Sequence, residues 1–226
     1  MTEELGTEAW LIHQYPIRDH LLLVYMLTPD RLIKGFYRVP KKPYVVKPQA
    51  FYPYWISWKQ NKQAINIQRM EAHRPGLTLQ GLKLFVGLYL NELIFNLCRD
   101  EALVPGFYSL YQHILYDETP CDELLLRQFE WQLLADCGYA IDFSCTHQQQ
   151  SIQANLHYQF NPNDGFMLSH DGISGQQLLA IEQGELETPA TMQVLKKILR
   201  QTIEHVLDGR VLHSRNLLKE WLLSQS

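Results

Sequence analysis

The chain contains few cysteines, no long apolar run and no secretion signal. Its four cysteines are widely spaced and none pairs with another at the short gap of a zinc knuckle, so we expect reduced thiols and no metal site; they are Cys98, Cys121, Cys137 and Cys145. No stretch of about eighteen apolar residues is present, which predicts that no segment spans a membrane. The N-terminus is acidic and lacks the basic and then apolar order of a secretion signal. From these absences we expect a cytoplasmic protein.

Motifs that carry catalysis are also missing. There is no P-loop, no glycine-rich dinucleotide turn and no Gly-x-Ser-x-Gly string. The nine histidines are scattered along the chain. An acidic group precedes one predicted helix, where carboxylates complement the helix dipole more often than they bind a metal; it consists of Asp117, Glu118, Asp122 and Glu123. We therefore expect no catalytic residues, no enzyme activity and no cofactor.

The charge of the chain is sorted along its length. Between Trp10 and Arg74 there are eleven basic residues and only three acidic ones, a net charge of +8. Residues 77–191 carry three basic and fifteen acidic residues, a net charge of −12, although the whole chain has only −4. A basic module with many aromatic residues, joined to an acidic body, is the electrostatic pattern expected of a nucleic-acid-binding protein.

The hydrophobic periodicity changes near residue 76. Before it, short runs of β-forming residues separated by turns predict a small barrel, with strands at 21–27, 32–38, 51–59 and 64–70. After it, helical spacing predicts helices at 79–97, 107–116, 123–137, 174–181, 190–207 and 214–223, with Thr78, Ser174 and Ser214 as N-caps, Gly138 as a C-cap and a hairpin near 152–170. We expect an α+β protein with a barrel in residues 1–76 and a mainly α-helical domain with a small β-hairpin insertion in residues 77–226.

The strongest candidate site is a strip of basic and aromatic residues between Lys34 and Lys62. Its cations can neutralise phosphates and its rings can stack on bases. The alternative is that the rings form the barrel core while the lysines are solvated, and for any single ring we favour the core. The basic residues are Lys34, Arg38, Lys41, Lys42, Lys47, Lys59 and Lys62, and the rings are Phe36, Tyr37, Tyr44, Phe51, Tyr52, Tyr54, Trp55 and Trp58.

Two features of the helical half also stand out. Arg127 is one of three basic groups in the acidic middle and follows the apolar Leu126. An arginine beside an apolar face can capture a peptide carboxylate, but from the residues alone we favour an ordinary pair with Glu123 or Glu130. The polar Asn91 and Glu92 interrupt an apolar helix, and we expect them to bind a neighbouring element by hydrogen bonds.

Several strings together resemble the RecO family of bacterial DNA repair and recombination mediator proteins. The resemblance runs from about Ala9 to Leu223. Its best parts are Lys34-Gly35, Gly87-Leu-Tyr-Leu-Asn-Glu-Leu93, Leu126-Arg-Gln-Phe-Glu130, Cys137-Gly-Tyr139 and Leu212-His-Ser-Arg-Asn-Leu217. The resemblance implies that the barrel is an OB-fold, and that the protein is nucleoid-associated and needs no nucleotide cofactor.

The resemblance also implies partners and site residues. Members of the family bind single- and double-stranded DNA, anneal strands and work with RecR to help load RecA onto strands covered by single-stranded DNA-binding protein. DNA contact would map onto Lys34, Arg38, Lys41 and Lys42. The acidic tail of the single-stranded DNA-binding protein would bind beside Arg127 and Leu126, where Gln128 replaces the second residue of a basic pair. The alternative is an adaptor that docks these partners through its helical domain with little DNA contact.

Overall fold

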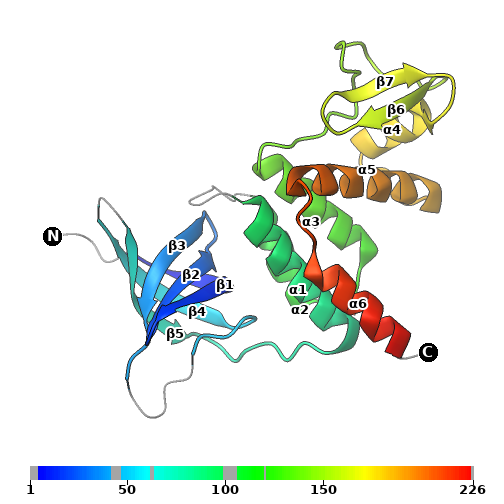
Figure 1. Cartoon of the computed structure of the whole chain (residues 1–226). Helices are drawn as coiled ribbons and strands as arrows, with labels where there is room; N and C mark the ends of the chain where they lie inside the picture. The colour runs from blue at the N-terminus through cyan, green and yellow to red at the C-terminus, as the bar shows by residue number, and fades with distance from the viewer. Residues whose placement is uncertain (1–4, 42–46, 62–63, 99–105, 120, 225–226) are drawn as a thin grey trace. The chain divides into compact units, whose positions relative to one another are not determined.

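The computed structural model describes residues 5–41, 47–61, 64–98, 106–119 and 121–224 (Figure 1). The chain divides into two compact units, Met1–Cys121 with Leu212–Ser226, and Asp122–Val211. The boundary predicted at residue 76 lies inside the first unit, where strands give way to helices. The predicted α+β class is confirmed by a closed barrel, six helices and a small second sheet among the described residues.

The N-terminal strands close into a five-stranded OB-type barrel. They are β1 (Leu5–Arg18), β2 (Leu21–Leu27), β3 (Leu32–Arg38), β4 (Pro53–Gln60) and β5 (Ile65–Ala72). Around the barrel they follow the order β1-β2-β3-β5-β4, in which β3 and β5 are parallel and the other pairs are antiparallel. The bounds of β1 were not predicted from the sequence. Its register shifts between Leu11 and His13 and between Pro16 and Arg18, and these irregularities break the alternation that marks a strand.

Alternation along the strands separates a core from an outer face. In β2, Leu22, Val24 and Met26 belong to the hydrophobic core of the barrel, so Leu23 and Tyr25 point outward. The other core side chains come from the other four strands and the residue after β3; they are Ala9, Leu11, Ile33, Tyr37, Val39, Tyr54, Ile56, Ile65 and Ile67. The interior of the barrel is therefore filled by side chains, and any ligand must bind outside it.

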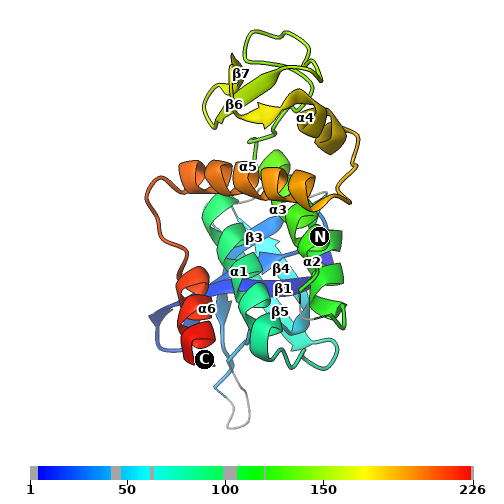
Figure 2. The same ribbon diagram turned by 90° about the vertical axis from the view of Figure 1, so that its right-hand side faces the viewer.

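Three helices complete the first unit: α1 (Gly81–Leu97), α2 (Phe107–Tyr116) and α6 (His213–Ser224). In both views α6 runs beside α1 (Figure 1, Figure 2). The polar pair on α1 has the structural role that we expected. Asn91 accepts a hydrogen bond from the Tyr111 hydroxyl at 2.8 Å, and Glu92 accepts the backbone N–H groups of His213 and Ser214 at 2.7 and 2.9 Å.

Two predicted N-caps are wrong. The first helix has Gln80 at its N-cap position, without a side-chain capping bond, rather than Thr78. The reason is that the N–H of Leu77 donates to the carbonyl of Phe51, which keeps the preceding segment extended. Helix α6 begins before Ser214, and the hydroxyl of Ser214 donates to Glu92 instead of accepting a backbone N–H. The cap of this helix is supplied by a side chain of α1.

The second unit holds the predicted hairpin. Its elements are α3 (Glu123–Asp136), β6 (His157–Asn161), β7 (Gly165–Ser169), β8 (Ile173–Ser174), α4 (Gly175–Glu182) and α5 (Pro189–Leu207). Strand β8 adds to the hairpin, which gives a sheet of order β7-β6-β8. Ser174 caps α4 in a capping box, and Gly138 follows α3 with φ +88°, so both of these predicted caps are confirmed.

Two residues of the acidic group that we expected to complement the helix dipole, Asp122 and Glu123, lie at the N-terminus of α3. Asp122 accepts the N–H of Leu125 at 3.1 Å as the N-cap of α3. Glu123 pairs with Lys196 of α5 at 2.7 Å, and this hydrogen bond holds the pKa of the Glu123 carboxyl below its usual value. None of the helices in the described ranges is long and apolar enough to cross a membrane.

Candidate nucleic-acid interface

The strand register lines up outward-facing side chains in rows across the barrel. Residues that are directly opposite each other on neighbouring strands lie on the same face of a sheet. Because Leu23 points outward, its partners on β1 and β3 do so as well. The central row, continued through β5 to β4, consists of Tyr15, Leu23, Phe36, Asn66 and Lys59. It places two rings and an aliphatic side chain next to one another and a cation at its far end.

A basic row flanks the central row at one end of these strands. Arg18 of β1 lies opposite Leu21, which in turn lies opposite Arg38 of β3. Both arginines are exposed to solvent. Since neighbouring strands are roughly 5 Å apart, the two arginine backbones are separated by roughly 10 Å.

A third row lies on the other side of the central one. His13 of β1 is opposite Tyr25, which is opposite Lys34 of β3. The Lys34 ammonium lies 5.6 Å from the centre of the Tyr25 ring, within the range of a cation–π contact. The rings of His13 and Phe95 are stacked with their centres 4.2 Å apart, and burial lowers the pKa of His13. Lys34 is therefore the positive charge of this row at neutral pH.

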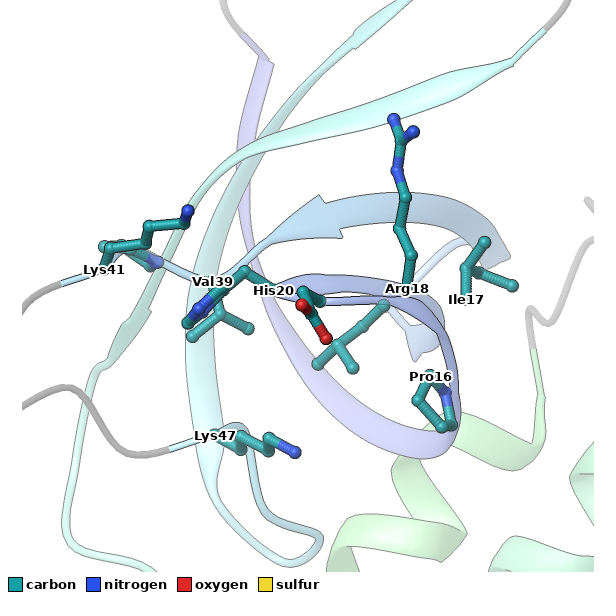
Figure 3. Close-up of a pocket in the computed structure, with 10 residues that line it drawn as sticks. Pro16, Ile17, Arg18, His20, Val39, Lys41 and Lys47 are labelled. Atoms are coloured by element: carbon teal, nitrogen blue, oxygen red, sulfur yellow. The ribbon is translucent and has the colours of Figure 1, made fainter.

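A surface pocket of about 800 Å³ extends the basic surface beyond Arg38. It lies between the β1–β2 turn and the segments on either side of residues 42–46, which are outside the described residues. Figure 3 shows Arg18, Lys41 and Lys47 around it on separate sides. Asp19 also lines the pocket and offsets part of this charge. Pockets of this size hold small ligands and parts of polymers, and the lining here favours an anionic one.

The predicted basic residues fall into two neighbouring groups. Lys34, Arg38 and Lys59 share the outer face, and Lys41 and Lys47 line the pocket. Lys42 and Lys62 lie outside the described residues. Arg18 and Tyr15 also belong to this surface but were not predicted as site residues, because the bounds of β1 were not predicted from the sequence.

Tyr37 and Tyr54 belong to the barrel core and Tyr52 and Trp58 pack against it, as we favoured for each ring, while Tyr44 lies outside the described residues. Phe51, Tyr37 and Tyr54 are buried, and burial raises the pKa of both tyrosines. Trp55 is 46% exposed, but its register neighbours are Glu8 and Glu71. Phe36 is the half-buried ring that shares a face with the lysines. An anionic ligand on the basic face would therefore meet Phe36 rather than Trp55.

Arg127 lies in the second unit in the ion pair that we favoured from the residues alone. Its Nη1 atom is 2.8 Å from Oε2 of Glu130, and the two side chains are 9% and 1% exposed. Leu126 is also buried. Among the described residues, no group of three or more histidine, cysteine, aspartate or glutamate side chains is arranged to hold a metal ion.

Comparison with known proteins relates the chain to one family. A family model described as Recombination protein O C terminal matches residues 79–216. DNA repair protein RecO of Legionella pneumophila (strain Lens) is 35% identical over 223 residues, which cover 92% of this chain and 95% of the relative. The chain belongs to the RecO family. This membership gives the chain a role in DNA repair and recombination.

More distant RecO proteins align over the barrel as well. DNA repair protein RecO of Cellvibrio japonicus (strain Ueda107) is 33% identical over 224 residues, covering 92% of this chain and 94% of the relative. DNA repair protein RecO of Pseudomonas putida (strain W619) is 29% identical over 227 residues, covering 97% of this chain and 100% of the relative. The similarity to RecO is therefore not confined to the helical part that the family model matches.

Proposed function

We propose that this RecO family member is a DNA-binding recombination mediator that holds single-stranded DNA on the outer face of its barrel. The observation that carries the proposal is the register that puts Lys34, Arg38 and Lys59 on one face, next to a pocket with Arg18 and Lys41. The outer face of β2 and β3 is where OB-folds bind oligonucleotides. Cations on this face neutralise phosphates, which removes the repulsion between two complementary strands and so favours their annealing.

The test is fluorescence-anisotropy binding of a labelled single strand across a salt series. The triple variant Lys34→Ala, Arg38→Ala, Lys59→Ala removes three phosphate contacts. Because each contact contributes about 0.7 to the slope of log K against log salt on a single strand, the slope should flatten by about 2. The loss of affinity should be similar for every base sequence, since phosphates carry no sequence information.

A charge-matched control distinguishes the effect of losing the outer-face cations from the effect of lowering the net charge. The variant Arg31→Ala, Lys197→Ala, Lys219→Ala removes the same charge from a barrel turn, from α5 and from α6. It should leave the salt slope nearly unchanged. Equal losses in both triple variants, or no loss in the first, would overturn the assignment of the outer face.

We further propose that the protein assists RecA loading together with RecR and the single-stranded DNA-binding protein, whose acidic tail binds beside Arg127 and Leu126. Arg127 is buried against Glu130, so replacing it alone leaves a buried carboxylate without its partner, at a cost of about 3–5 kcal/mol. The double variant Arg127→Met, Glu130→Gln removes both charges and should fold. It should lose binding of an acidic tail peptide while DNA binding stays intact; retained peptide binding would exclude Arg127 as the contact.

We propose that this mediator acts without chemistry of its own. Incubating labelled DNA with the protein and magnesium or manganese tests this directly. Intact strands are the expected result. Metal-dependent cleavage that copurifies with the protein and disappears in the Lys34, Arg38, Lys59 variant would identify a nuclease instead.

A further inference from the structure

The part of the central row on β1 to β3 is apolar and aromatic, with two arginines in the row on one side and Lys34 in the row on the other. Tyr15 and Phe36 lie on strands β1 and β3, with Leu23 of β2 between them. Tyr15 is 41% exposed, and Leu23 and Phe36 are partly exposed. Cations alone would be enough to attract an anion. Apolar side chains between Lys34 on one side and Arg18 and Arg38 on the other therefore favour a ligand that has apolar surface as well as charge.

The dimensions of the face match a nucleic-acid strand. Tyr15 and Phe36 are separated by two strand spacings, roughly 10 Å, which is about the length of three stacked bases at 3.4 Å each. Along β2 and β3, each flanking row is two residues from the central row, which is roughly 7 Å. A strand laid along the central row would therefore have cations within reach on either side of its bases.

The ring of Tyr15 is held in place by its neighbours. It meets His13 edge-on with ring centres 4.4 Å apart, and the Phe95 ring of α1 lies 6.0 Å away. His13 is itself stacked on Phe95. A ring that is already ordered loses little conformational freedom when a base stacks on it, so the cluster is suited to binding flat ligands.

We infer that the row Tyr15, Leu23 and Phe36 stacks the bases of unpaired DNA, so that the outer face selects single strands over duplexes. In a duplex the base faces are covered by their neighbours, and only phosphates and base edges reach a protein surface. A single strand can turn its bases onto the row while its phosphates meet Lys34, Arg18 and Arg38. The row offers one polar group, the Tyr15 hydroxyl, so it should accept every base. This inference rests on the proposed function and adds its preferred ligand.

The experiment compares three labelled probes: an oligothymidylate, a strand of the same length made of abasic sites, and a duplex of matched length. The variant Tyr15→Leu, Phe36→Leu keeps an apolar surface but removes both π faces. It should bind the oligothymidylate about fivefold to 150-fold more weakly for each ring lost. Affinities for the abasic strand and the duplex should change by less than about twofold, because they depend on phosphates alone.

Trp55→Leu is the matched control. It removes an exposed ring from the same barrel at a position flanked by Glu8 and Glu71, and it should leave all three affinities within about twofold. Unchanged binding of the abasic strand by the Tyr15 and Phe36 variant also shows that the basic face is still folded.

The outcomes separate this inference from the proposed function. If the Lys34, Arg38, Lys59 variant binds DNA as tightly as the parent protein, the outer face is not the DNA site, and both the proposed function and the stacking row are wrong. If that variant loses affinity but the Tyr15 and Phe36 variant weakens all three probes equally, or none of them, the face binds DNA through phosphates alone and only the stacking row is wrong.

Discussion

The carboxylate of Glu92 should stabilise the first unit by capping α6. It accepts hydrogen bonds from the N–H groups of His213 and Ser214 and from the Ser214 hydroxyl. Loss of an N-cap costs about 1 kcal/mol, and a buried hydroxyl left without a partner costs about 1–3 kcal/mol. Because Ser214 is only 5% exposed, both costs apply, and we expect Glu92→Ala to lower the free energy of unfolding by about 2–4 kcal/mol.

Two measurements check this prediction. Urea unfolding gives the change in the free energy of unfolding, and hydrogen exchange of the α6 amides shows whether the helix detaches before the unit unfolds. Glu92→Gln keeps an acceptor oxygen without the charge and should lower the free energy of unfolding by about half as much as Glu92→Ala. Glu220→Ala, an exposed acid on α6 itself, is the control and should change the free energy by less than about 0.5 kcal/mol. A Glu92→Ala protein as stable as this control, with unchanged exchange in α6, would refute the capping role.

Two further predictions concern the second unit. The hydrogen bond from Lys196 lowers the pKa of Glu123 in the folded protein. The pair therefore stabilises the fold fully above the unfolded pKa of about 4.5. This stabilisation is lost as the pH falls through the lower pKa of the folded state. Since both side chains are about half exposed, Glu123→Gln should cost at most about 1 kcal/mol at pH 7 and nothing below the folded pKa, which urea melts at several pH values measure. Gly175→Ala places a Cβ 2.0 Å from the carbonyl oxygen of Gln153 and should destabilise the unit by about 2 kcal/mol or more. Gly184→Ala, whose Cβ meets open space, should destabilise it by only about 1 kcal/mol. Thermal unfolding of the two variants measures the difference. A Gly175→Ala protein as stable as the Gly184→Ala protein would show that the backbone yields at no cost.

The strands and helices that the sequence predicted well are those whose periodicity is undisturbed. Alternation placed β2 and β3 at their observed bounds, and helical spacing placed α2 at Phe107–Tyr116. The caps at Gly138 and Ser174 were predictable because they depend on local backbone geometry. The sequence wrongly predicted N-caps at Thr78 and Ser214, because contacts with distant parts of the chain decide where these two helices begin. These contacts are the hydrogen bond from Leu77 to Phe51 and the hydrogen bonds to the carboxylate of Glu92.

The candidate site, too, depends on contacts between distant parts of the chain that the sequence alone does not reveal. The sequence identified Lys34, Arg38 and Lys59 as basic residues of one strip, but residue order alone could not show which rings share their face. That depends on strand register, which brings Tyr15 of β1 opposite Leu23 and turns Tyr37 and Tyr54 inward. The disturbed alternation of β1 concealed both Tyr15 and Arg18.

The way the chain returns to its first unit has a consequence for folding during synthesis. The backbone partners of Glu92 lie 121 and 122 residues further along the chain, beyond the whole second unit. A ribosome that adds about 5–20 residues per second therefore needs about 6–24 s after Glu92 before α6 can dock. During that interval the barrel strands, which all precede Glu92, can already close. The apolar surface of α1 that α6 later covers stays open to water or to a chaperone. The last helix thus acts as the closing step in the assembly of the first unit.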